Sequence, residues 1–168
     1  MKQAPEGRPS ARGLRVAIVR SLFNRAVTDG LLAGAREALA EMGAGRGRVE
    51  VYDLPGAFEL PLAARAAARS GRFDAVVALG AVVEGETDHY EHVAREAASG
   101  LASVARETGV PVAFGVLTVR KEAHARRRAA PGPGNKGAEA ARAAVMTALA
   151  LRAIEKGRRQ RPATRRGR

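Results

Sequence analysis

The sequence predicts an α/β fold of three layers, in which a four-stranded parallel core sheet is flanked by helices. Short apolar runs rich in β-branched residues alternate along the chain with segments whose apolar residues recur every three or four positions. Strands that alternate with helices in this way form parallel sheets with right-handed crossovers. The 168 residues, 46% of them hydrophobic, suit one domain with a proper core.

The first half of the chain is expected to hold two strands, each followed by a helix. Residues 14–22 contain a continuous apolar run that is typical of a buried strand. The next helix ends before Gly43 and places a row of apolar residues on one face, namely Val27, Leu31, Ala35, Leu39 and Met42. Residues 49–54 form the second strand, which stops at Pro55-Gly56, and residues 58–69 form the second helix.

The second half repeats this order and ends in two successive helices. Residues 75–83 are apolar and rich in valine, which predicts the third strand. A helix at 87–107 closes at Thr108-Gly109, and the fourth strand follows at 112–118. The last two helices, a short polar one at 121–128 and a long one at 135–155, are separated by a segment with two prolines and two glycines.

Most of the formal net charge of +12 lies at the C-terminus. Residues 156–168 contain no acidic side chain, and their basic ones are Lys156, Arg158, Arg159, Arg161, Arg165, Arg166 and Arg168. This segment has too few apolar residues to offset the entropy lost on ordering, and we therefore expect a disordered basic tail at 156–168. The remaining chain is expected to form a flexible N-terminal segment at 1–13 and one domain at 14–155. No aromatic residue lies among the arginines to stack on bases, and we do not expect nucleic acid as a partner.

Several classes of function are excluded by composition. The chain has no cysteine for disulfides or thiolate metal sites, and its three histidines do not have the spacing of a zinc site. No phosphate loop or dinucleotide fingerprint is present, and no apolar run approaches the roughly 20 residues of a membrane span. Residues 1–13 lack the apolar region of a secretory signal. We therefore expect a cytoplasmic protein without a zinc site, a nucleotide cofactor or a membrane partner.

The loop Gly80 to Tyr90 is the predicted functional site, because it joins the third strand to the next helix. The carboxyl ends of parallel strands face the crevice where such sheets bind ligands, and helix N-termini attract anions. His89 is suited to proton transfer near neutral pH. The loops after the first and second strands, with Phe23-Asn24 and residues 56–59, reach the same edge, and Thr118 ends the fourth strand there.

Two interpretations remain open for the aromatic and acidic residues of these loops. Phe23 and Phe58 can cap the sheet hydrophobically, or they can form a stacking platform for a flat ring. Glu59 can be a solvated acid in the first turn of a helix, or it can accept hydrogen bonds from a ligand in the crevice. The arginines 126–128 and Lys136 can lie on a solvated face or bind a phosphate.

Several segments together resemble the 6,7-dimethyl-8-ribityllumazine synthases of riboflavin biosynthesis. They occur in the family's order between about residues 15 and 154, and they are Phe23-Asn24, Pro55-Gly-Ala-Phe-Glu-Leu-Pro61, Gly80-Ala-Val-Val-Glu-Gly-Glu-Thr-Asp-His-Tyr90, Glu107-Thr-Gly-Val-Pro-Val112, Phe114-Gly-Val-Leu-Thr118 and Gly134-Asn-Lys-Gly137. The resemblance implies a flavodoxin-like subunit in pentamers, which in some members pack into icosahedral shells, with active sites between neighbouring subunits.

The resemblance also implies the reaction and the residues that perform it. The family condenses 5-amino-6-(D-ribitylamino)uracil with 3,4-dihydroxy-2-butanone 4-phosphate, releasing phosphate and water without a cofactor or metal. His89 matches the proton-transfer residue and Phe23 the residue that stacks on the pyrimidine. Ala57, Phe58, Glu59, Val82 and Val83 match positions that line the ring and ribityl pocket, and Asn24 is a further substrate-binding position beside Phe23. Glu86 and Thr87 match positions near the phosphate, Arg128 matches the phosphate arginine, and Phe114 and Lys136 match the contribution of the neighbouring subunit.

The chain departs from the family pattern between Val119 and Gly134. If the register slips there, Arg127 or Arg126 could take the place of Arg128, and the choice between a pentamer and a larger shell stays open. The alternative function is a non-catalytic shell, or a flavin- or lumazine-binding paralogue, whose basic tail binds nucleic acid. The presence of Phe23, Glu59 and His89 favours the enzyme, because a scaffold has no need of them.

Overall fold

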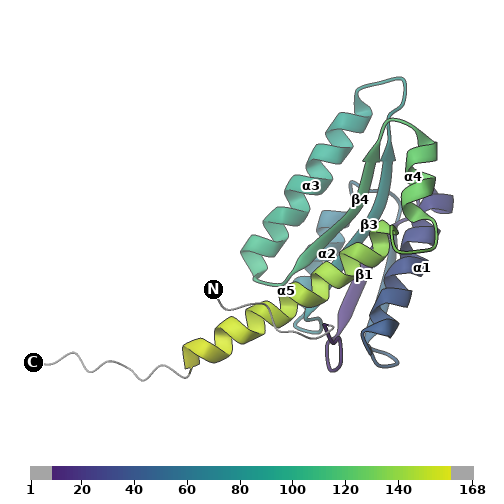
Figure 1. Cartoon of the computed structure of the whole chain (residues 1–168). Helices are drawn as coiled ribbons and strands as arrows, with labels where there is room; N and C mark the ends of the chain where they lie inside the picture. The colour runs from purple at the N-terminus through teal and green to yellow at the C-terminus, as the bar shows by residue number, and fades with distance from the viewer. Residues whose placement is uncertain (1–8, 160–168) are drawn as a thin grey trace, which may run out of the picture.

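The computed structural model describes residues 9–159, and within this range it contains four strands and five helices (Figure 1). They are β1 (Val16–Ser21), α1 (Arg25–Glu41), β2 (Val49–Leu54), α2 (Leu60–Arg69), β3 (Ala75–Val83), α3 (His89–Thr108), β4 (Val112–Val119), α4 (Glu122–Ala129) and α5 (Lys136–Arg159). The strands pair in parallel in the order β2-β1-β3-β4. The predicted parallel α/β fold is confirmed.

The helices cover both faces of the sheet and make two hydrophobic cores. Successive side chains of a strand point to opposite faces. Ile18, Val77 and Leu79 therefore pack against α1, α4 and α5, whereas Val19 and Val76 pack against α2 and α3. Since β1 and β3 are buried along almost their whole length, the sheet is the middle one of three layers (Figure 1).

The order of the strands places a crevice at the carboxyl end of the sheet. From β1 the chain crosses to β2 on one side, and from β3 it continues to β4 on the other. Loops that leave adjacent strands toward opposite sides open a space between them, and this is where open α/β sheets bind ligands. The loops after β1 and β3 therefore flank the expected site.

The ends of the domain reach further than the sequence predicts. Residues 9–13 belong to the segment expected to be flexible, yet Ala11 is buried and its backbone N–H donates to the carbonyl of Met42 over 2.8 Å. At the other end, α5 continues to Arg159, whereas the pattern predicts a helix end near 155. The remainder of the expected N-terminal segment and basic tail, residues 1–8 and 160–168, lies outside the described residues.

Helices α1 and α5 approach each other backbone to backbone. A Cβ atom on Gly137 would overlap the carbonyl group of Leu31, and one on Gly34 would overlap the side-chain amide of Asn135. Glycine is needed at both positions, because a side chain at position 137 would force the two helices apart and one at position 34 would displace the amide of Asn135. This contact fixes the start of α5 against the middle of α1.

Asn135 ties three parts of the chain together at this contact. Its side chain is 2% exposed, and its amide nitrogen donates to the carbonyls of Gly30, Ala129 and Ala130 over 3.0, 2.9 and 3.1 Å. Its amide oxygen accepts from the backbone N–H of Ala138 over 3.0 Å, which caps α5. One buried amide thus joins α1, the end of α4 and the start of α5.

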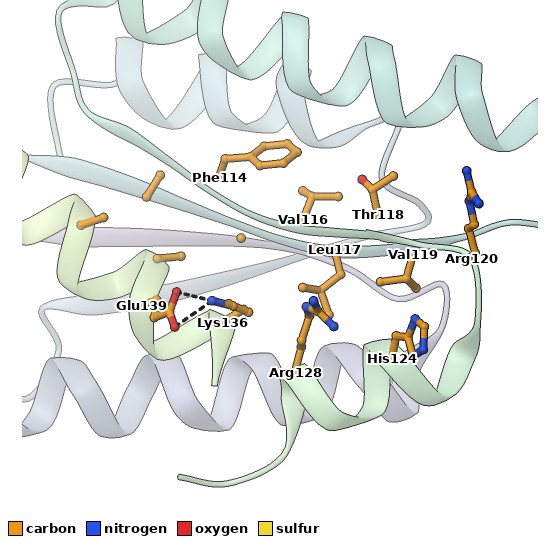
Figure 2. A pocket seen from close by; sticks show the side chains of 14 residues that line it. Phe114, Val116, Leu117, Thr118, Val119, Arg120, His124, Arg128, Lys136 and Glu139 are labelled. Atoms are coloured by element: carbon orange, nitrogen blue, oxygen red, sulfur yellow. Dashed lines mark hydrogen bonds and ion pairs between the residues drawn. The ribbon is translucent and has the colours of Figure 1, made fainter. Parts of the chain in front are cut away.

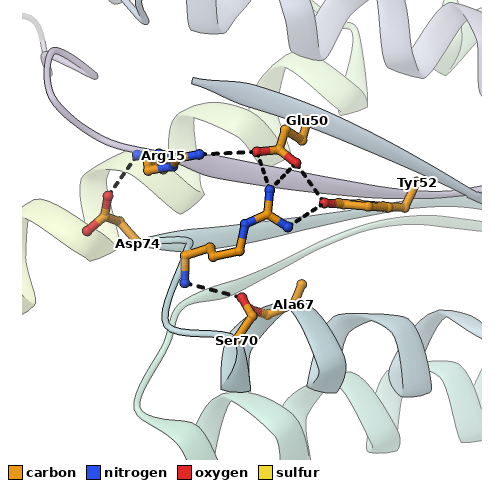
Figure 3. Close-up of polar contacts among 7 residues, drawn as sticks. Arg15, Glu50, Tyr52, Ala67, Ser70 and Asp74 are labelled. Carbon is orange, nitrogen blue, oxygen red and sulfur yellow. Dashed lines mark hydrogen bonds and ion pairs between the residues drawn. The ribbon is translucent and has the colours of Figure 1, made fainter. Parts of the chain in front are cut away.

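A polar network joins the strands at the amino end of the sheet, away from the crevice (Figure 3). The carboxylate of Glu50 accepts hydrogen bonds from Arg15, Tyr52 and Arg72, the closest from Arg72 at 2.6 Å. The bonds from Tyr52 and Arg72 hold the pKa of Glu50 below its ordinary value. Arg72 also lies over the ring of Phe73 at 5.0 Å from its centroid, so the turn before β3 is anchored to the edge strand.

A second ion pair lies closer to the crevice, where Arg20 of β1 is opposite Asp53 of β2. Arg20 is 6% exposed and donates to both carboxylate oxygens of Asp53 over 2.8 Å, and it also contacts Asp29 of α1. The hydrogen bonds from Arg20 hold the pKa of Asp53 below its ordinary value of 3.8. A depressed carboxyl pKa stabilises the fold above pH 3.8, and this contribution is lost as the pH falls below that value.

We expect Asp53→Asn to lower the free energy of unfolding at pH 7 by about 1 kcal/mol, since solvent screens a carboxylate whose side chain is 41% exposed. Urea unfolding at pH 7, 5 and 3 measures the free energy of unfolding of both proteins. The difference in this free energy between variant and wild type should shrink below about pH 4. Glu122→Gln, which removes an exposed pair with Arg126, is the control and should have almost no effect. A difference that grows toward acid pH would contradict this assignment.

Candidate functional site

The first cavity, which we call the aromatic cavity, lies in the crevice at the carboxyl end of the sheet. It has a volume of about 560 Å³ and is built from the loops after β1 and β2, the end of β3 and the start of α3. Its lining residues are Phe23, Gly56, Ala57, Phe58, Glu59, Ala81, Val82, Val83, Gly85, Thr87, His89, Tyr90, His92 and Val93. The chain thus brings together three segments that are far apart in the sequence, because one short loop joins the end of β3 to the start of α3.

Two phenylalanines form the outer part of this cavity. Phe23 is 69% exposed and Phe58 is 58% exposed, so neither ring is covered by the core. This exposure disfavours the interpretation that they cap the sheet hydrophobically and leaves their faces free for a flat ligand. The backbone N–H of Phe23 donates to the carbonyl of Pro55 over 3.1 Å, which joins the two loops that carry the rings.

Asn24 fixes the loop behind Phe23 without lining the cavity itself. Its backbone adopts the left-handed conformation, with φ of 57°, and it is the only residue other than glycine in the described part of the chain with a positive φ. Its side-chain amide donates to the carbonyl of Ala81 over 2.9 Å. Asparagine tolerates this conformation better than most residues, so Asn24 can turn the chain from β1 into α1 and hold it against β3.

The start of α3 supplies the polar part of the aromatic cavity. His89 is the first residue of the helix, and Thr87 precedes its N-cap residue Asp88. The first N–H groups of a helix have no partner within the helix, so they are donors for an anion. Glu59 and His92 are the other titratable side chains of the lining besides Tyr90, and within the described residues no arginine or lysine lines this cavity.

The second cavity, which we call the edge cavity, follows the open edge of β4 (Figure 2). Its volume is about 580 Å³, and it is lined by β4 together with parts of α4 and α5. Phe114, 47% exposed, and Thr118 project to one side of β4, whereas His124, Arg128 and Lys136 lie on the other side. Its polar lining side chains are Thr118, Arg120, His124, Arg128, Lys136 and Glu139.

The cations of the edge cavity differ in how they are paired. Lys136 contacts Glu139 over 2.7 Å, and Arg120 contacts Glu84 over 3.8 Å. Among residues 9–159, neither Arg128 nor His124 has a hydrogen bond or ion pair to a carboxylate. Arg128 is therefore a cation available to an external anion, and the His124 imidazole beside it on α4 is likewise without a carboxylate partner in this part of the chain.

The three successive arginines of α4 have different surroundings. Arg126 pairs with Glu122 over 2.7 Å and does not line the cavity, and Arg127 does not line it either. The buried Ala125 and Ala129 fix the rotation of the helix and leave Arg128 on the face toward β4. The geometry favours Arg128 over Arg126 and Arg127 as the residue that binds phosphate.

The structure divides the predicted site residues between the two cavities. Phe23, Ala57, Phe58, Glu59, Val82, Val83, Thr87 and His89 line the aromatic cavity, and Phe114, Arg128 and Lys136 line the edge cavity. Asn24 and Glu86 line neither. Thr118, expected beside the other loops, belongs to the edge cavity because β4 is the outermost strand of the described sheet.

Some lining residues were not predicted as site residues. Tyr90, His92 and Val93 follow His89 on the first turns of α3, and helical spacing places His92 beside His89. His124 lies four residues before Arg128 on α4, so the same spacing could have found it once Arg128 was selected. Glu139 carries no such signal, because acidic residues are common in the first turn of a helix.

The two cavities suit different chemistry. The aromatic cavity offers ring faces, a carboxylate and a histidine, which fits a flat polar ring that undergoes proton transfer. The edge cavity offers Arg128, a cation with no carboxylate partner among residues 9–159, which fits a phosphate. In residues 9–159 no three histidine, cysteine or acidic side chains gather as metal ligands would, and no helix has the length and apolar character of a membrane span.

Comparison with known proteins gives two findings. The sequence model of the 6,7-dimethyl-8-ribityllumazine synthase family matches residues 13–152. A protein of Anaeromyxobacter dehalogenans (strain 2CP-C) named 6,7-dimethyl-8-ribityllumazine synthase is 50% identical over 149 residues, which cover 89% of this chain and 92% of that protein. Both matches include the segments that form the two cavities.

Proposed function

Because the chain belongs to the 6,7-dimethyl-8-ribityllumazine synthase family, we propose that its active site combines the aromatic cavity of one subunit with the edge cavity of a neighbour. The protein is a transferase of riboflavin biosynthesis that condenses 5-amino-6-(D-ribitylamino)uracil with 3,4-dihydroxy-2-butanone 4-phosphate. Its product is 6,7-dimethyl-8-ribityllumazine. The alternative of a non-catalytic shell or binding paralogue is not supported by the comparisons.

The division of charge between the cavities is the observation that carries this proposal. One substrate is a flat pyrimidine and the other carries a phosphate. The aromatic cavity has Phe23 and Phe58 for the ring, but its described lining contains no arginine or lysine to neutralise a phosphate. The edge cavity has that charge in Arg128, and neither cavity includes a lining residue of the other. A second copy of the chain can supply the missing cations.

The proposed mechanism distributes the chemical steps over these residues. Phe23 stacks on the pyrimidine ring, and Glu59 accepts hydrogen bonds from the same substrate. The amine attacks the ketone carbonyl and a first water leaves as the imine forms. Phosphate is then eliminated, and the second nitrogen attacks the remaining carbonyl carbon, which closes the new ring with loss of a second water. His89 moves protons during these steps, because histidine changes its charge readily near neutral pH. Arg128 and the first N–H groups of α3 hold the phosphate until it leaves.

The assembly required by this proposal is head to tail, with different surfaces of each subunit in contact. Such contacts generate closed rings when the rotation between subunits closes. We propose the pentamer that the resemblance implies, alone or packed into an icosahedral shell. In residues 9–159 the outer edge of β4 pairs with no other strand, and it lies beside the edge cavity, which supports a contact at this side of the subunit (Figure 2).

Subunit complementation tests the shared site. His89→Ala and Arg128→Ala are each expected to be nearly inactive at limiting phosphorylated ketone, when measured by lumazine fluorescence. Co-expression of the two variants should restore about a quarter of the wild-type rate, because random head-to-tail rings place an intact His89 next to an intact Arg128 at that frequency. Mixed rings no more active than the average of the two pure variants would place both residues in one subunit's site.

Phe23→Ala is expected to raise the KM of the pyrimidine substrate at least about threefold, because a stacked ring contributes roughly 0.5–1.5 kcal/mol beyond its buried area. The KM of the phosphorylated ketone should change little. Steady-state kinetics with each substrate varied in turn measures both values. Leu22→Ala, which removes a neighbouring side chain outside the cavity lining, is the control. Equal changes in both KM values would count against stacking.

Arg128→Ala is expected to weaken inhibition by inorganic phosphate by about tenfold or more, since a fork-shaped cation with no competing carboxylate binds phosphate strongly. Arg126→Ala should change the inhibition constant by less than about fivefold, because Arg126 is exposed and paired with Glu122, and such solvated charges contribute about 0–1 kcal/mol. Inhibition constants at one fixed pH and salt concentration compare the two variants. An equal loss of phosphate affinity in both variants would show that the anion site has been assigned to the wrong residue.

A further inference from the structure

We propose that His124 is a second phosphate ligand, which forms a two-cation clamp with Arg128 on one face of α4. The inference rests on the proposed function, because it concerns the phosphate that Arg128 is proposed to hold. It adds a side chain that the family resemblance does not assign, and it predicts that phosphate affinity depends on the charge of this side chain.

The geometry of α4 brings the two side chains together. Residues four apart on a helix are neighbours on its surface, with Cβ atoms about 5–6 Å apart. His124 and Arg128 both line the edge cavity, and both point from α4 toward β4 (Figure 2).

Helix α4 cannot readily turn these side chains away. Ala125 is 0% exposed and Ala129 is 4% exposed, and both pack into the core beside α1. A Cβ atom on Gly30 of α1 would come within 2.5 Å of the carbonyl oxygen of Ala129, so the end of α4 lies directly on the backbone of α1. The amide of Asn135 also holds this carbonyl at 2.9 Å. The clamp is therefore built on a fixed helix.

The charges around His124 leave it available to a ligand. Most of the neighbouring charged groups on α4, β4, α5, α1 and the loop after β3 are paired with each other: Glu122 with Arg126, Arg120 with Glu84, Lys136 with Glu139, and Asp29 with Arg20 and Arg25. The other cations on or beside α4 are Lys121, Arg127 and Arg128. Within residues 9–159, no carboxylate pairs with His124, so an incoming anion meets no competitor there.

A histidine beside an arginine makes this anion site sensitive to pH. A protonated imidazole donates from both ring nitrogens and carries a positive charge, whereas the neutral form has one donor and no charge. Histidine side chains change between these forms within about pH 5–8. Phosphate also changes its own charge in this range, so the contribution of His124 has to be measured as a ratio between variants at each pH.

The test uses the full-length protein and inorganic phosphate, titrated by calorimetry and by inhibition at pH 5.5, 7 and 8.5. His124→Gln should bind phosphate about three- to tenfold more weakly than wild type at pH 5.5, with a ratio near one at pH 8.5. His124→Lys, which keeps a positive charge, should match wild type at pH 5.5 and exceed its affinity at pH 8.5. Arg127→Gln, exposed on the same helix outside the cavity, is the control.

The outcomes separate this inference from the proposed function. If Arg128→Ala weakens phosphate binding but the ratio for His124→Gln stays the same at every pH, His124 is not a ligand and the inference is wrong. If Arg128→Ala leaves phosphate binding unchanged, the phosphate site itself is misplaced, and the proposed active site shared between two subunits fails with it. His124 is exposed, so its replacement should not disturb folding.

Discussion

Replacement of His89 by alanine is expected to lower kcat by about 10- to 10⁴-fold, the range for loss of one general acid–base group. The expectation follows from the place of His89 at the start of α3, where its side chain lines the aromatic cavity beside Glu59 and Thr87. Activity should remain measurable, because holding two substrates side by side accelerates their reaction without proton transfer. Stopped-flow lumazine formation with both substrates saturating gives kcat directly.

The neighbouring His92 supplies the comparison for this variant. It lines the same cavity from the next turn of α3 and is equally a histidine. We expect His92→Ala to change kcat by less than about threefold, because a solvated side chain without a role in proton transfer contributes little to the rate. If His92→Ala loses as much activity as His89→Ala, the proton-transfer role belongs to His92 or is shared.

The largest effect on stability is expected from Gly137→Ala, which should lower the free energy of unfolding by at least about 3 kcal/mol, the upper part of the range for overpacked cores. The added methyl group would occupy the same space as the Leu31 carbonyl. Because the clash is with backbone rather than with a flexible side chain, α1 and α5 have to separate. Chemical denaturation measures the loss of stability. A variant that cannot be recovered as folded protein would indicate an even larger loss.

Gly157→Ala is the matched control, since Gly157 lies in the same helix and an added methyl group would meet nothing within 4 Å beyond the backbone of its own helix and its chain neighbours. Alanine favours helix by up to about 1 kcal/mol over glycine, so this variant should be as stable as wild type or slightly more stable. A Gly137→Ala protein with unchanged stability would show that the two helices are not in backbone contact in solution.

The elements of the fold were predictable because each one has a local signal. The apolar run of β3 and the stops at Gly43 and Gly109 place boundaries within one or two residues of those observed. Patterns of apolar residues and turn formers depend only on neighbours in the sequence. The end of α5 at Arg159 was missed because a basic, glycine-containing segment has no apolar period to continue the helix.

The division of the site into two cavities could not be predicted from periodicity. The sequence shows that several loops follow strands, but it does not show that β4 is an outer strand or that α4 and α5 fold along its edge. That arrangement depends on long-range contacts such as the amide of Asn135 and the close approach at Gly34. Sequence motifs could select Arg128 and Lys136 as candidates for phosphate binding. Only the three-dimensional fold shows that these two residues line a different cavity from His89 within one subunit.

The hydrogen bonds of Asn135 have a consequence for protein engineering. The amide holds the carbonyls of Ala129 and Ala130 at one end of residues 131–134 and begins α5 at the other, so both ends of this short loop are fastened at one point. The loop itself is exposed. Lengthening a loop between fixed ends costs only about 0.6 kcal/mol for each doubling of its length. A peptide grafted between Gly132 and Pro133 should therefore be displayed on the outside of the subunit, with phosphate inhibition the same before and after grafting.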